Sequence, residues 1–393
     1  MDSVSQKILS PIKHHARKTK KKNRLYKALK LIGFFMVITV ISAIIFIKVN
    51  TSAAANLTDN VLRPLLGAER VLFLEKIFFN ASDQIERLTF NQNSAVAPQF
   101  VDQGLGDNLT GSNLDLTSIL VNKNFTPVSG EGMWKNRSLN LFPNKEVMAY
   151  SFVRSDPDRP FSLTTLVQVD TKAIGIGSVA GIKEPGGPVG KPGSGIIPQN
   201  VIASGNLIAA FDGGFQYKDG AYGMIVGDTT YLPLKNDLGT FIGYKDGKLK
   251  IIDYQGGSIG LDAAFVRQNC PMLINNGEIT TDNPRSKALW GRLALGTTDI
   301  FTWRSGVGIN KDGNLLFAVG NNLTPTTLAN ALKSAGAVDA IQLDINPIWV
   351  RFNIFDSIGD GKYKSTPLNK QLYDGANGYL NGYNKDFFYL YAK

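Results

Sequence analysis

An uncharged apolar run near the start of the chain divides it into two very unequal parts. The run occupies residues 31–47 and reads LIGFFMVITVISAIIFI, seventeen positions without a charged side chain. A membrane-spanning helix needs about 17–25 such residues. Lys30 and Lys48 flank the run and can reach the polar interface at its two ends. The sequence therefore predicts a transmembrane anchor over residues 31–48.

The basic residues are concentrated ahead of this run. Residues 1–30 contain ten of the 42 Lys and Arg residues and one acid, so they carry +9 of the formal net charge of +10. Basic residues beside a span usually set its topology or contact anionic lipid. We therefore expect a cytoplasmic tail rather than a nucleic-acid-binding segment. The large C-terminal part is then extracytoplasmic, in a single-pass membrane protein.

A cleaved signal peptide is the alternative interpretation of residues 31–55. The small residues of TSAAAN, which follow the run, are typical of a cleavage site. The basic region is long, however, and the apolar core exceeds the roughly 7–15 residues usual in a signal peptide. These lengths favour an uncleaved anchor that contacts membrane lipid.

Two segments of different character follow the anchor. Residues 57–90 have apolar residues at helical spacing, with Thr58 or Asp59 as a cap and Pro64 admissible only in the first turn. They predict a helical stalk or packing helix, and a partner-binding or dimerising helix is the alternative. Residues 91–146 are rich in Asn, Gln, Ser, Asp and Gly, which predicts a polar linker or loosely ordered segment.

Short strands and turn dipeptides dominate residues 147–393. The strand-like runs alternate apolar and polar residues, and hairpin turns are expected at Asp246-Gly247, Asn276-Gly277 and Asp312-Gly313. One helix, LANALKSAGA, is expected to begin at Thr324 or Thr326 and to end at Gly336. This pattern predicts an α+β domain with a mixed or mainly antiparallel sheet and few helices.

The scarcity of cysteine and histidine excludes several kinds of site. Cys270 is the sole cysteine, and the histidines are His14 and His15 in the basic tail. An intrachain disulfide is therefore excluded, as are Ser-His or Cys-His catalysis and a His-ligated zinc site in the outer domain. No stretch has the twelve-residue calcium-loop pattern. We predict no metal site, and the sequence does not identify a cofactor.

Three stretches place polar groups beside tight backbone. In AAFDGGF an apolar strand is followed by Asp212, and Gly213 and Gly214 let the chain turn and a ligand approach backbone N–H groups. WRSGVGINKDG carries Arg304 ahead of a strand-turn-strand pattern. GAVDAIQLDINP ends an apolar run on Asp344. Each stretch also has an ordinary structural interpretation. Asp-Gly-Gly is typical of a turn, Arg304 of a surface or paired arginine, and Asp344 of a residue that caps a turn.

The order and spacing of these stretches, from about residue 207 to residue 350, resemble the phosphodiester glycosidase family. This family includes the lysosomal uncovering enzyme and bacterial exopolysaccharide-associated homologues. AAFDGGF is similar to its Asn-Gly-Gly-Phe-Phe region, and RSGVGINKDGNLLFAVG to its Arg-Thr-Ala-(Ile/Leu)-Gly hairpin. CPMLINNGEI is similar to its Pro-x-Leu segment, and TPTTLANALKSAGAVDAIQLD to the helix that leads to Leu-Asp-Gly-Gly-Gly-Ser. The chain departs from the family at Asp212, where the family has Asn, and after Asp344, where Ile345-Asn346-Pro347 replace the glycines and serine.

The resemblance implies hydrolysis of a sugar-1-phosphodiester in a surface glycan or polysaccharide. Such a reaction needs a cation for the phosphate and a carboxylate that activates water or stabilises an oxocarbenium-like state. The catalytic candidates are Asp344, Arg304 and Asp212, and the substrate-binding candidates are Gly213, Gly214 and Arg267, with Arg292 as a further cation. The alternative is a catalytically degenerate glycan-binding or scaffold domain of the same fold, in which Asp344 is a structural acid. The expected ligand is an anionic sugar or glycan, and the sequence does not identify a protein partner.

Overall fold

The computed structural model describes five stretches of the chain, residues 57–91, 97–100, 112–282, 301–372 and 377–393. Six single residues are described besides, namely Tyr26, Lys30, Leu31, Ser42, Trp290 and Gly375. The chain forms two compact units, Met1–Phe78 and Phe79–Lys393. Apart from four of these single residues, the predicted tail and anchor lie outside the described stretches, as does Arg292. Among the helices that the structure describes, none has the length and apolar character needed to cross a membrane.

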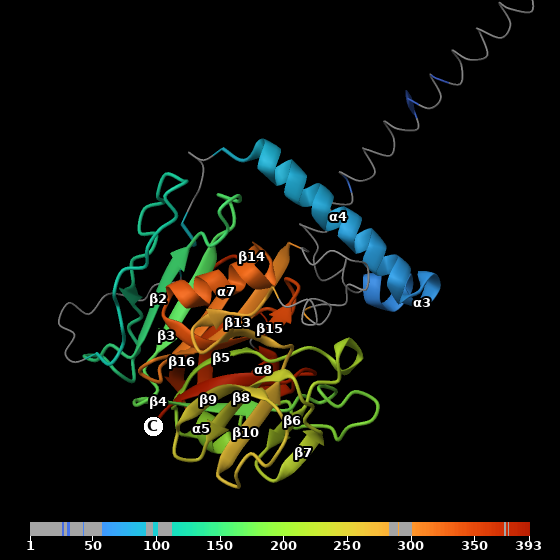
Figure 1. The fold of residues 1–393 in the computed structure, drawn as a ribbon. Coiled ribbons are helices and arrows are strands. Elements are labelled where there is room, and N and C mark those ends of the chain that lie inside the picture. Colours follow the sequence, from blue (N-terminus) through green and yellow to red (C-terminus); the bar gives the residue numbers. More distant parts are fainter. Residues whose placement is uncertain are drawn as a thin grey trace, which may run out of the picture. The chain divides into compact units, whose positions relative to one another are not determined.

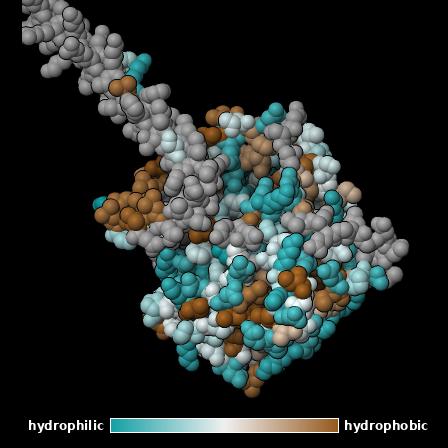
Figure 2. Space-filling view, turned by 180° about the vertical axis from the view of Figure 1, so that it is seen from behind, coloured by the Kyte–Doolittle hydropathy of each residue, from teal (hydrophilic) through white to brown (hydrophobic). Residues whose placement is uncertain are grey.

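Helices fill most of the segment predicted to be a stalk. They are η1 (Thr58–Leu62), a π-helical turn, α3 (Arg63–Leu66) and α4 (Ala68–Thr89). Gly67 separates α3 from α4 with a φ of 85°, a conformation that L-residues with side chains rarely adopt. Apolar side chains gather on the surface of η1 and α3 (Figure 2), where Leu65 is 74% exposed. The use of these helices as a stalk stays a prediction.

The ends of these helices differ from the expectation in one respect. Pro64 lies in the first turn of α3, as the sequence requires, because a proline N–H is not needed there. The expected cap by Thr58 or Asp59 is wrong. Leu57, the residue before η1, already has helical dihedral angles, and no side chain caps the turn.

Part of the predicted linker belongs to the large unit. Strand β1 (Lys135–Asn136) lies within residues 91–146 and pairs with β2 (Met148–Val153). Glu131 and Arg154 form a buried ion pair at 2.6 Å that ties this segment to the end of β2. The sheet domain therefore includes residues that precede position 147.

The largest sheet has eight strands, and every described neighbour pair in it is antiparallel. In sheet order its strands are β1, β2, β3 (Thr164–Val169), β14 (Leu315–Leu323), β13 (Thr302–Asn310), β15 (Ala337–Ile345), β11 (Met272–Asn275) and β12 (Glu278–Ile279). Helix α7 (Pro325–Ser334) packs across β13, β14 and β15 (Figure 1). Thr324 caps α7 through a capping box with Thr327, and Gly336 follows its C-terminus with a φ of 93°. The start at Thr324 and the stop at Gly336 are confirmed.

Two five-stranded antiparallel sheets complete the domain. One has the order β7 (Thr229–Leu232), β6 (Met224–Val226), β10 (Ala263–Gln268), β8 (Leu238–Tyr244) and β9 (Leu249–Tyr254). The other has the order β17 (Lys362–Pro367), β16 (Phe352–Gly359), β5 (Leu207–Asp212), β18 (Phe387–Ala392) and β4 (Ile174–Val179). The short helices are α5 (Gln199–Ala203), η3 (Tyr217–Asp219) and α8 (Asn377–Asn381). The prediction of mainly antiparallel sheets with few helices is confirmed.

Phenylalanines from all three sheets meet in one aromatic core. The ring centroid of Phe211 in β5 lies 5.1 Å from that of Phe317 in β14 and 5.3 Å from that of Phe388 in β18. Phe388 in turn lies 5.2 Å from Phe241 of β8. All four rings are fully buried, and tilted or offset rings at such separations attract one another beyond their area burial. This core fixes the end of β5, where Asp212 follows Phe211.

The three turn dipeptides lie where the sequence predicts hairpins. They connect β8 to β9, β11 to β12, and β13 to β14. The glycines at the second position have φ values of 86°, 81° and 81° at Gly247, Gly277 and Gly313. Short connections between antiparallel strands often need positive φ at one position, which glycine adopts without strain.

Candidate active site

Asp212 is the last residue of β5, and three donors hold its carboxyl group. Its Oδ2 accepts hydrogen bonds from the Ser305 hydroxyl at 2.5 Å and from the Asp344 N–H at 3.3 Å. Its Oδ1 accepts from the Arg351 N–H at 2.9 Å. Burial, and then the charge of Asp344, raise the pKa of Asp212 to about 7. This carboxyl group is therefore divided between its acid and ionised forms at neutral pH.

Asp344 lies next to Asp212 and forms an ion pair with Lys385. Its Oδ2 accepts from the Lys385 ammonium, and its Oδ1 accepts from the Ile345 N–H at 2.9 Å. Asp344 is 3% exposed and Lys385 is 2% exposed. Burial raises the pKa of Asp344 to about 6, and the positive charge of Lys385 opposes that rise. Asp344 therefore ionises more readily than Asp212.

Ser305 of β13 links the two carboxyl groups. Its Oγ donates to Asp212 and accepts from the Asp344 N–H at 3.1 Å. β13 and β15 are adjacent antiparallel strands, with Arg304 opposite Ile345. This pairing places Ser305 beside Asp344, so the network is built from the ends of three strands.

The position of Lys385 follows from the pairing of β18 with β5. These strands are antiparallel, and Phe387 at the start of β18 lies opposite Asp212 at the end of β5. The two residues before β18, Lys385 and Asp386, therefore reach the same end of the sheet as Asp212. A strand from the C-terminal end of the sequence thus completes a site begun by β5.

Arg267, predicted to bind substrate, is locked in a buried ion pair with Asp386. Its Nε and Nη2 donate to the two carboxylate oxygens at 2.8 Å and 3.0 Å. Nη1 donates to the carbonyls of Tyr222 and Gln268, and Nη2 also donates to that of Phe215. With all three guanidinium nitrogens occupied, Arg267 holds protein groups together.

Gly213 and Gly214 also face this ion pair. The Gly214 N–H donates to Asp386 Oδ2 at 3.0 Å, and the Gly213 N–H donates to the Asp386 carbonyl at 3.2 Å. A Cβ atom on Gly214 would lie 2.7 Å from Arg267 Cζ, and one on Gly213 would lie 2.1 Å from Asp386 Oδ2. Because glycine has no side chain, these two positions leave room for the Arg267–Asp386 pair. The sequence predicts that a ligand approaches the backbone here, and in the structure the pair occupies that place.

Arg304 points its guanidinium group at main-chain and amide oxygens. Its Nε donates to the Leu323 carbonyl at 2.8 Å, and its Nη1 donates to Gln342 Oε1 at 2.8 Å and to the Trp290 carbonyl at 3.1 Å. Arg304 is 2% exposed. Among its described contacts, none is to the carboxylates of Asp212 or Asp344. The structure therefore brings the two predicted acids together and gives Arg304 a separate network.

Two aromatic rings lie against the cations of the site. The Trp349 ring is 4.7 Å from Lys385 Nζ, and the Tyr383 ring is 5.0 Å from the guanidinium carbon of Arg351. Burial raises the pKa of Tyr383, so its hydroxyl stays protonated at neutral pH. Cation–ring contacts of this kind stabilise a charge that has lost part of its hydration.

Sequence reasoning missed three members of the site, Ser305, Arg351 and Lys385. The segment NKDFFYLYA carries a signal that could have identified Lys385, because two charged residues stand directly before an apolar run. The same kind of signal, a charge at a strand end, was present at Asp212. Ser305 and Arg351 have no comparable signal, because serine and arginine are ordinary residues at their positions.

The arrangement provides an acid and a base in one buried place. Two carboxyl groups with different pKa values are a frequent basis for general acid–base catalysis. In the part of the chain that the structure describes, no group of three or more His, Cys, Asp or Glu side chains is arranged to hold a metal ion. The chemistry that these residues offer is proton transfer, with Lys385 as the charge that can attract an anion.

Comparison with known proteins connects this site to a family. Residues 205–344 match the family model described as phosphodiester glycosidase. The match includes Asp212, Ser305 and Asp344 and ends before Arg351 and Lys385. No match to the chain was found among curated proteins.

The chain is also similar, at low sequence identity, to several solved structures. The zebrafish N-acetylglucosamine-1-phosphodiester alpha-N-acetylglucosaminidase catalytic domain, auto-inhibited by its pro-peptide, is 15% identical, with 66% of this chain and 88% of that chain covered and a TM-score of 0.41. A hypothetical protein from Synechocystis is 9% identical, with coverages of 66% and 64% and a TM-score of 0.36. A putative exported protein from Burkholderia pseudomallei is 9% identical, with coverages of 59% and 74% and a TM-score of 0.27. The family match confirms the resemblance seen in the sequence: the chain contains a phosphodiester glycosidase domain, matched over residues 205–344.

Proposed function

We propose that this protein hydrolyses a sugar-1-phosphodiester in a surface glycan or polysaccharide. The observation that carries the proposal is the hydrogen-bonded network of Asp212, Ser305, Asp344 and Lys385, most of which falls within the matched family region. A sugar-1-phosphodiester has one negative charge and a glycosidic bond at C1. A lysine beside two carboxyl groups fits both features.

The two acids have different roles in this proposal. Asp212, with its pKa near 7, gives a proton to the phosphate oxygen as the C1–O bond breaks. Asp344, with its pKa near 6, takes a proton from the water that adds to C1. The products are the free sugar and a phosphate monoester. Lys385 attracts the phosphate, in the role that the sequence assigns to Arg304 and Arg267.

Substrate entry requires a local opening of the site. Asp212 and Asp344 are each 3% exposed, and Lys385 is paired with Asp344. An anionic substrate can compete for Lys385 and so loosen that pair. Trp349, whose ring lies against Lys385, would move with it.

Turnover of a simple diester tests the proposal. The full chain is incubated with the methyl diester of N-acetylglucosamine-1-phosphate, and release of methyl phosphate is followed by mass spectrometry. We expect turnover by the unchanged protein and at least about a 100-fold loss in Asp344→Asn and Asp212→Asn, since general acid–base catalysis contributes about that much. Asp253→Asn, at an exposed position of β9, is the matched control. Turnover that is the same in all four proteins refutes the roles assigned to the acids.

A second candidate is a glycan-binding domain without catalysis. The buried Asp344–Lys385 pair favours it, because a sealed ion pair can also be purely structural. The family's glycines after Asp344 are also replaced here by Ile345-Asn346-Pro347. Binding of the diester without release of methyl phosphate under any condition would select this candidate.

We also propose that residues 31–48 anchor the protein in a membrane, with residues 1–30 cytoplasmic and the glycosidase domain outside. The uncharged run and the basic tail before it support this placement. The helices within residues 57–90 would then connect the anchor to the domain. Protease added to intact cells is expected to digest the domain, and digestion only after lysis would contradict the placement. Sequencing the N-terminus of the mature protein separates an anchor from a cleaved signal peptide.

A further inference from the structure

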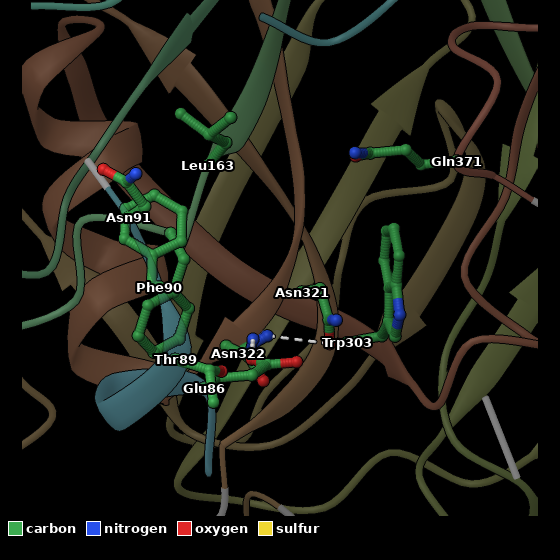
Figure 3. A pocket seen from close by; sticks show the side chains of 10 residues that line it. Glu86, Thr89, Phe90, Asn91, Leu163, Trp303, Asn321, Asn322 and Gln371 are labelled. Atoms are coloured by element: carbon green, nitrogen blue, oxygen red, sulfur yellow. Dashed lines mark hydrogen bonds between the residues drawn. The ribbon is translucent and has the colours of Figure 1, made fainter. Parts of the chain in front are cut away.

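A cavity of about 470 Å³ lies beside the eight-stranded sheet. Its lining comes from the end of α4, the segment before β3 and the ends of β13 and β14, and it includes Phe90, Phe161, Trp303, Asn321 and Gln371. In Figure 3, Trp303 and Gln371 lie on one side of the opening and Phe90 lies on the other. The volume lies within the range of small-ligand sites, about 300–1,000 Å³.

Three aromatic rings give the cavity its apolar surface. Phe90, Phe161 and Trp303 are all only partly buried, although large aromatic side chains are usually covered in a folded domain. Phe90 and Phe161 contact each other at 5.6 Å between ring centroids. Trp303 packs one part against the main core and leaves the rest in the cavity. Flat apolar faces of this kind suit the C–H face of a pyranose ring.

Amide side chains give the cavity its polar groups. Asn321 Oδ1 accepts the N–H of Asn322 at 2.8 Å, which fixes the orientation of the Asn321 amide. Asn321 and Gln371 both contribute side-chain amides to the lining. Amides offer donors and acceptors together. Sugar hydroxyls, which also donate and accept, are matched to such groups.

The charge of the lining separates this cavity from the candidate active site. Glu86 is the one carboxylate among the described lining residues, and it accepts a hydrogen bond from Asn322 Nδ2 at 2.5 Å. Among the lining residues that the structure describes, there is neither lysine nor arginine. A phosphate or another anion would therefore meet no cation there, while the Asp344 site has Lys385.

We propose that this cavity binds an uncharged sugar unit of a glycan. Aromatic faces for the ring, fixed amides for the hydroxyls and the lack of a lining cation all favour a neutral sugar over a nucleotide or a sugar phosphate. The inference goes beyond the proposed function, because the cavity binds sugar whether or not Asp212 and Asp344 hydrolyse anything. Trp303 and Ser305 are two residues apart on β13, which corresponds to roughly 7 Å along a strand. A glycan held in the cavity thus lies near the acids.

Binding of defined oligosaccharides by the full chain tests this inference. The probes are chitotetraose, maltotetraose and cellotetraose, with tetragalacturonate as the anionic counterpart, each titrated by calorimetry. We expect a millimolar or tighter Kd for at least one neutral probe and weaker binding of tetragalacturonate. Trp303→Ala is expected to weaken the neutral probe about 10-fold or more, and Gln371→Ala severalfold.

The variants are chosen so that the result does not depend on folding. Gln371 is exposed, and its replacement removes no core contact. Trp134→Ala, at another partly buried tryptophan, is the matched control and is expected to bind like the unchanged protein. Asp212→Asn, which leaves no buried charge without its partner, is expected to lose diester turnover and keep sugar binding, so failure of the acid site is distinguishable from failure of the cavity. No binding of any neutral probe overturns the inference, as does binding unaffected by both cavity variants or preference for tetragalacturonate.

Discussion

The ammonium group of Lys385 is paired with the carboxylate of Asp344, and both side chains are almost completely buried. Lys385 lies two residues before the start of β18, while Asp344 lies near the end of β15 in a different sheet. Taking two charges out of water is costly unless each finds a partner. The pair therefore joins two sheets at the place where the candidate acids meet.

Replacing Lys385 by Met is expected to destabilise the domain by about 3–5 kcal/mol, because it leaves Asp344 as a buried carboxyl group without its cation. The free energy of unfolding in urea measures this effect. Lys333→Met is the control, since Lys333 and Glu278 form an exposed pair with a separation of 3.9 Å. Its effect is expected to stay below about 1 kcal/mol. Equal effects of the two substitutions would contradict a stabilising role for the buried pair.

The stability of the domain is expected to fall as the pH rises from about 4 to 7. Carboxyl groups of an unfolded chain titrate near pH 4, while the pKa is about 7 for Asp212 and about 6 for Asp344 in the fold. The folded state therefore binds more protons than the unfolded state in this window. The contribution of these two groups to the free energy of unfolding is fully present at low pH and is lost as they ionise. Urea unfolding at a series of pH values tests this direction.

Asp212→Asn is expected to flatten this pH dependence and to stabilise the protein at pH 8. The neutral amide can accept from the Arg351 N–H through its oxygen and donate to the Ser305 Oγ through its nitrogen, without the cost of a buried charge. A shift in pKa from 3.8 to about 7 corresponds to roughly 4 kcal/mol as an upper bound. An unchanged slope of stability against pH in the variant would show that Asp212 does not titrate as described.

Diester turnover is expected to have a bell-shaped pH dependence with its maximum between pH 6 and 7. Asp344 must be ionised, which needs a pH above its pKa of about 6, and Asp212 must be protonated, which needs a pH below its pKa of about 7. The measurement is kcat/KM from pH 4 to 9. A profile that rises steadily to pH 9 would exclude Asp212 as the acid.

Arg267→Lys is expected to destabilise the domain by about 2–4 kcal/mol, because lysine cannot reproduce the paired hydrogen bonds to Asp386. The effect should appear in thermal and urea unfolding, while the KM for the diester in protein that remains folded should change little. An increase in KM with unchanged stability would restore the role in substrate binding that the sequence suggests.

Much of the fold is readable from the sequence because its signals are local. The Asp-Gly and Asn-Gly pairs specify hairpins, and Thr324 and Gly336 bound a helix, through the dihedral angles that these residues favour. The apolar runs that end at Asp212 and Asp344 are strands for the same reason. Both acids stand out because a charge at the end of a buried strand is unusual.

The rest of the site depends on strand pairing over long distances in sequence. Lys385 meets Asp344 only because β18 pairs with β5, and no local pattern specifies that partner. The sequence assigns Arg304 and Arg267 to a phosphate by residue type, yet the structure surrounds Arg304 with carbonyl and amide oxygens and Arg267 with carbonyl and carboxylate oxygens. Whether an arginine binds a ligand or the protein itself is decided by neighbours from other strands.

The central claim is that Asp212 and Asp344 cleave the bond between a sugar and its phosphate at C1. Hydrolysis of the methyl diester of N-acetylglucosamine-1-phosphate in ¹⁸O-labelled water, followed by mass spectrometry of both products, tests it most directly. The account predicts one ¹⁸O atom in the sugar, none in methyl phosphate, and no labelled sugar from Asp344→Asn. Label in the phosphate, or equal labelling of the sugar by Asp344→Asn, would contradict it.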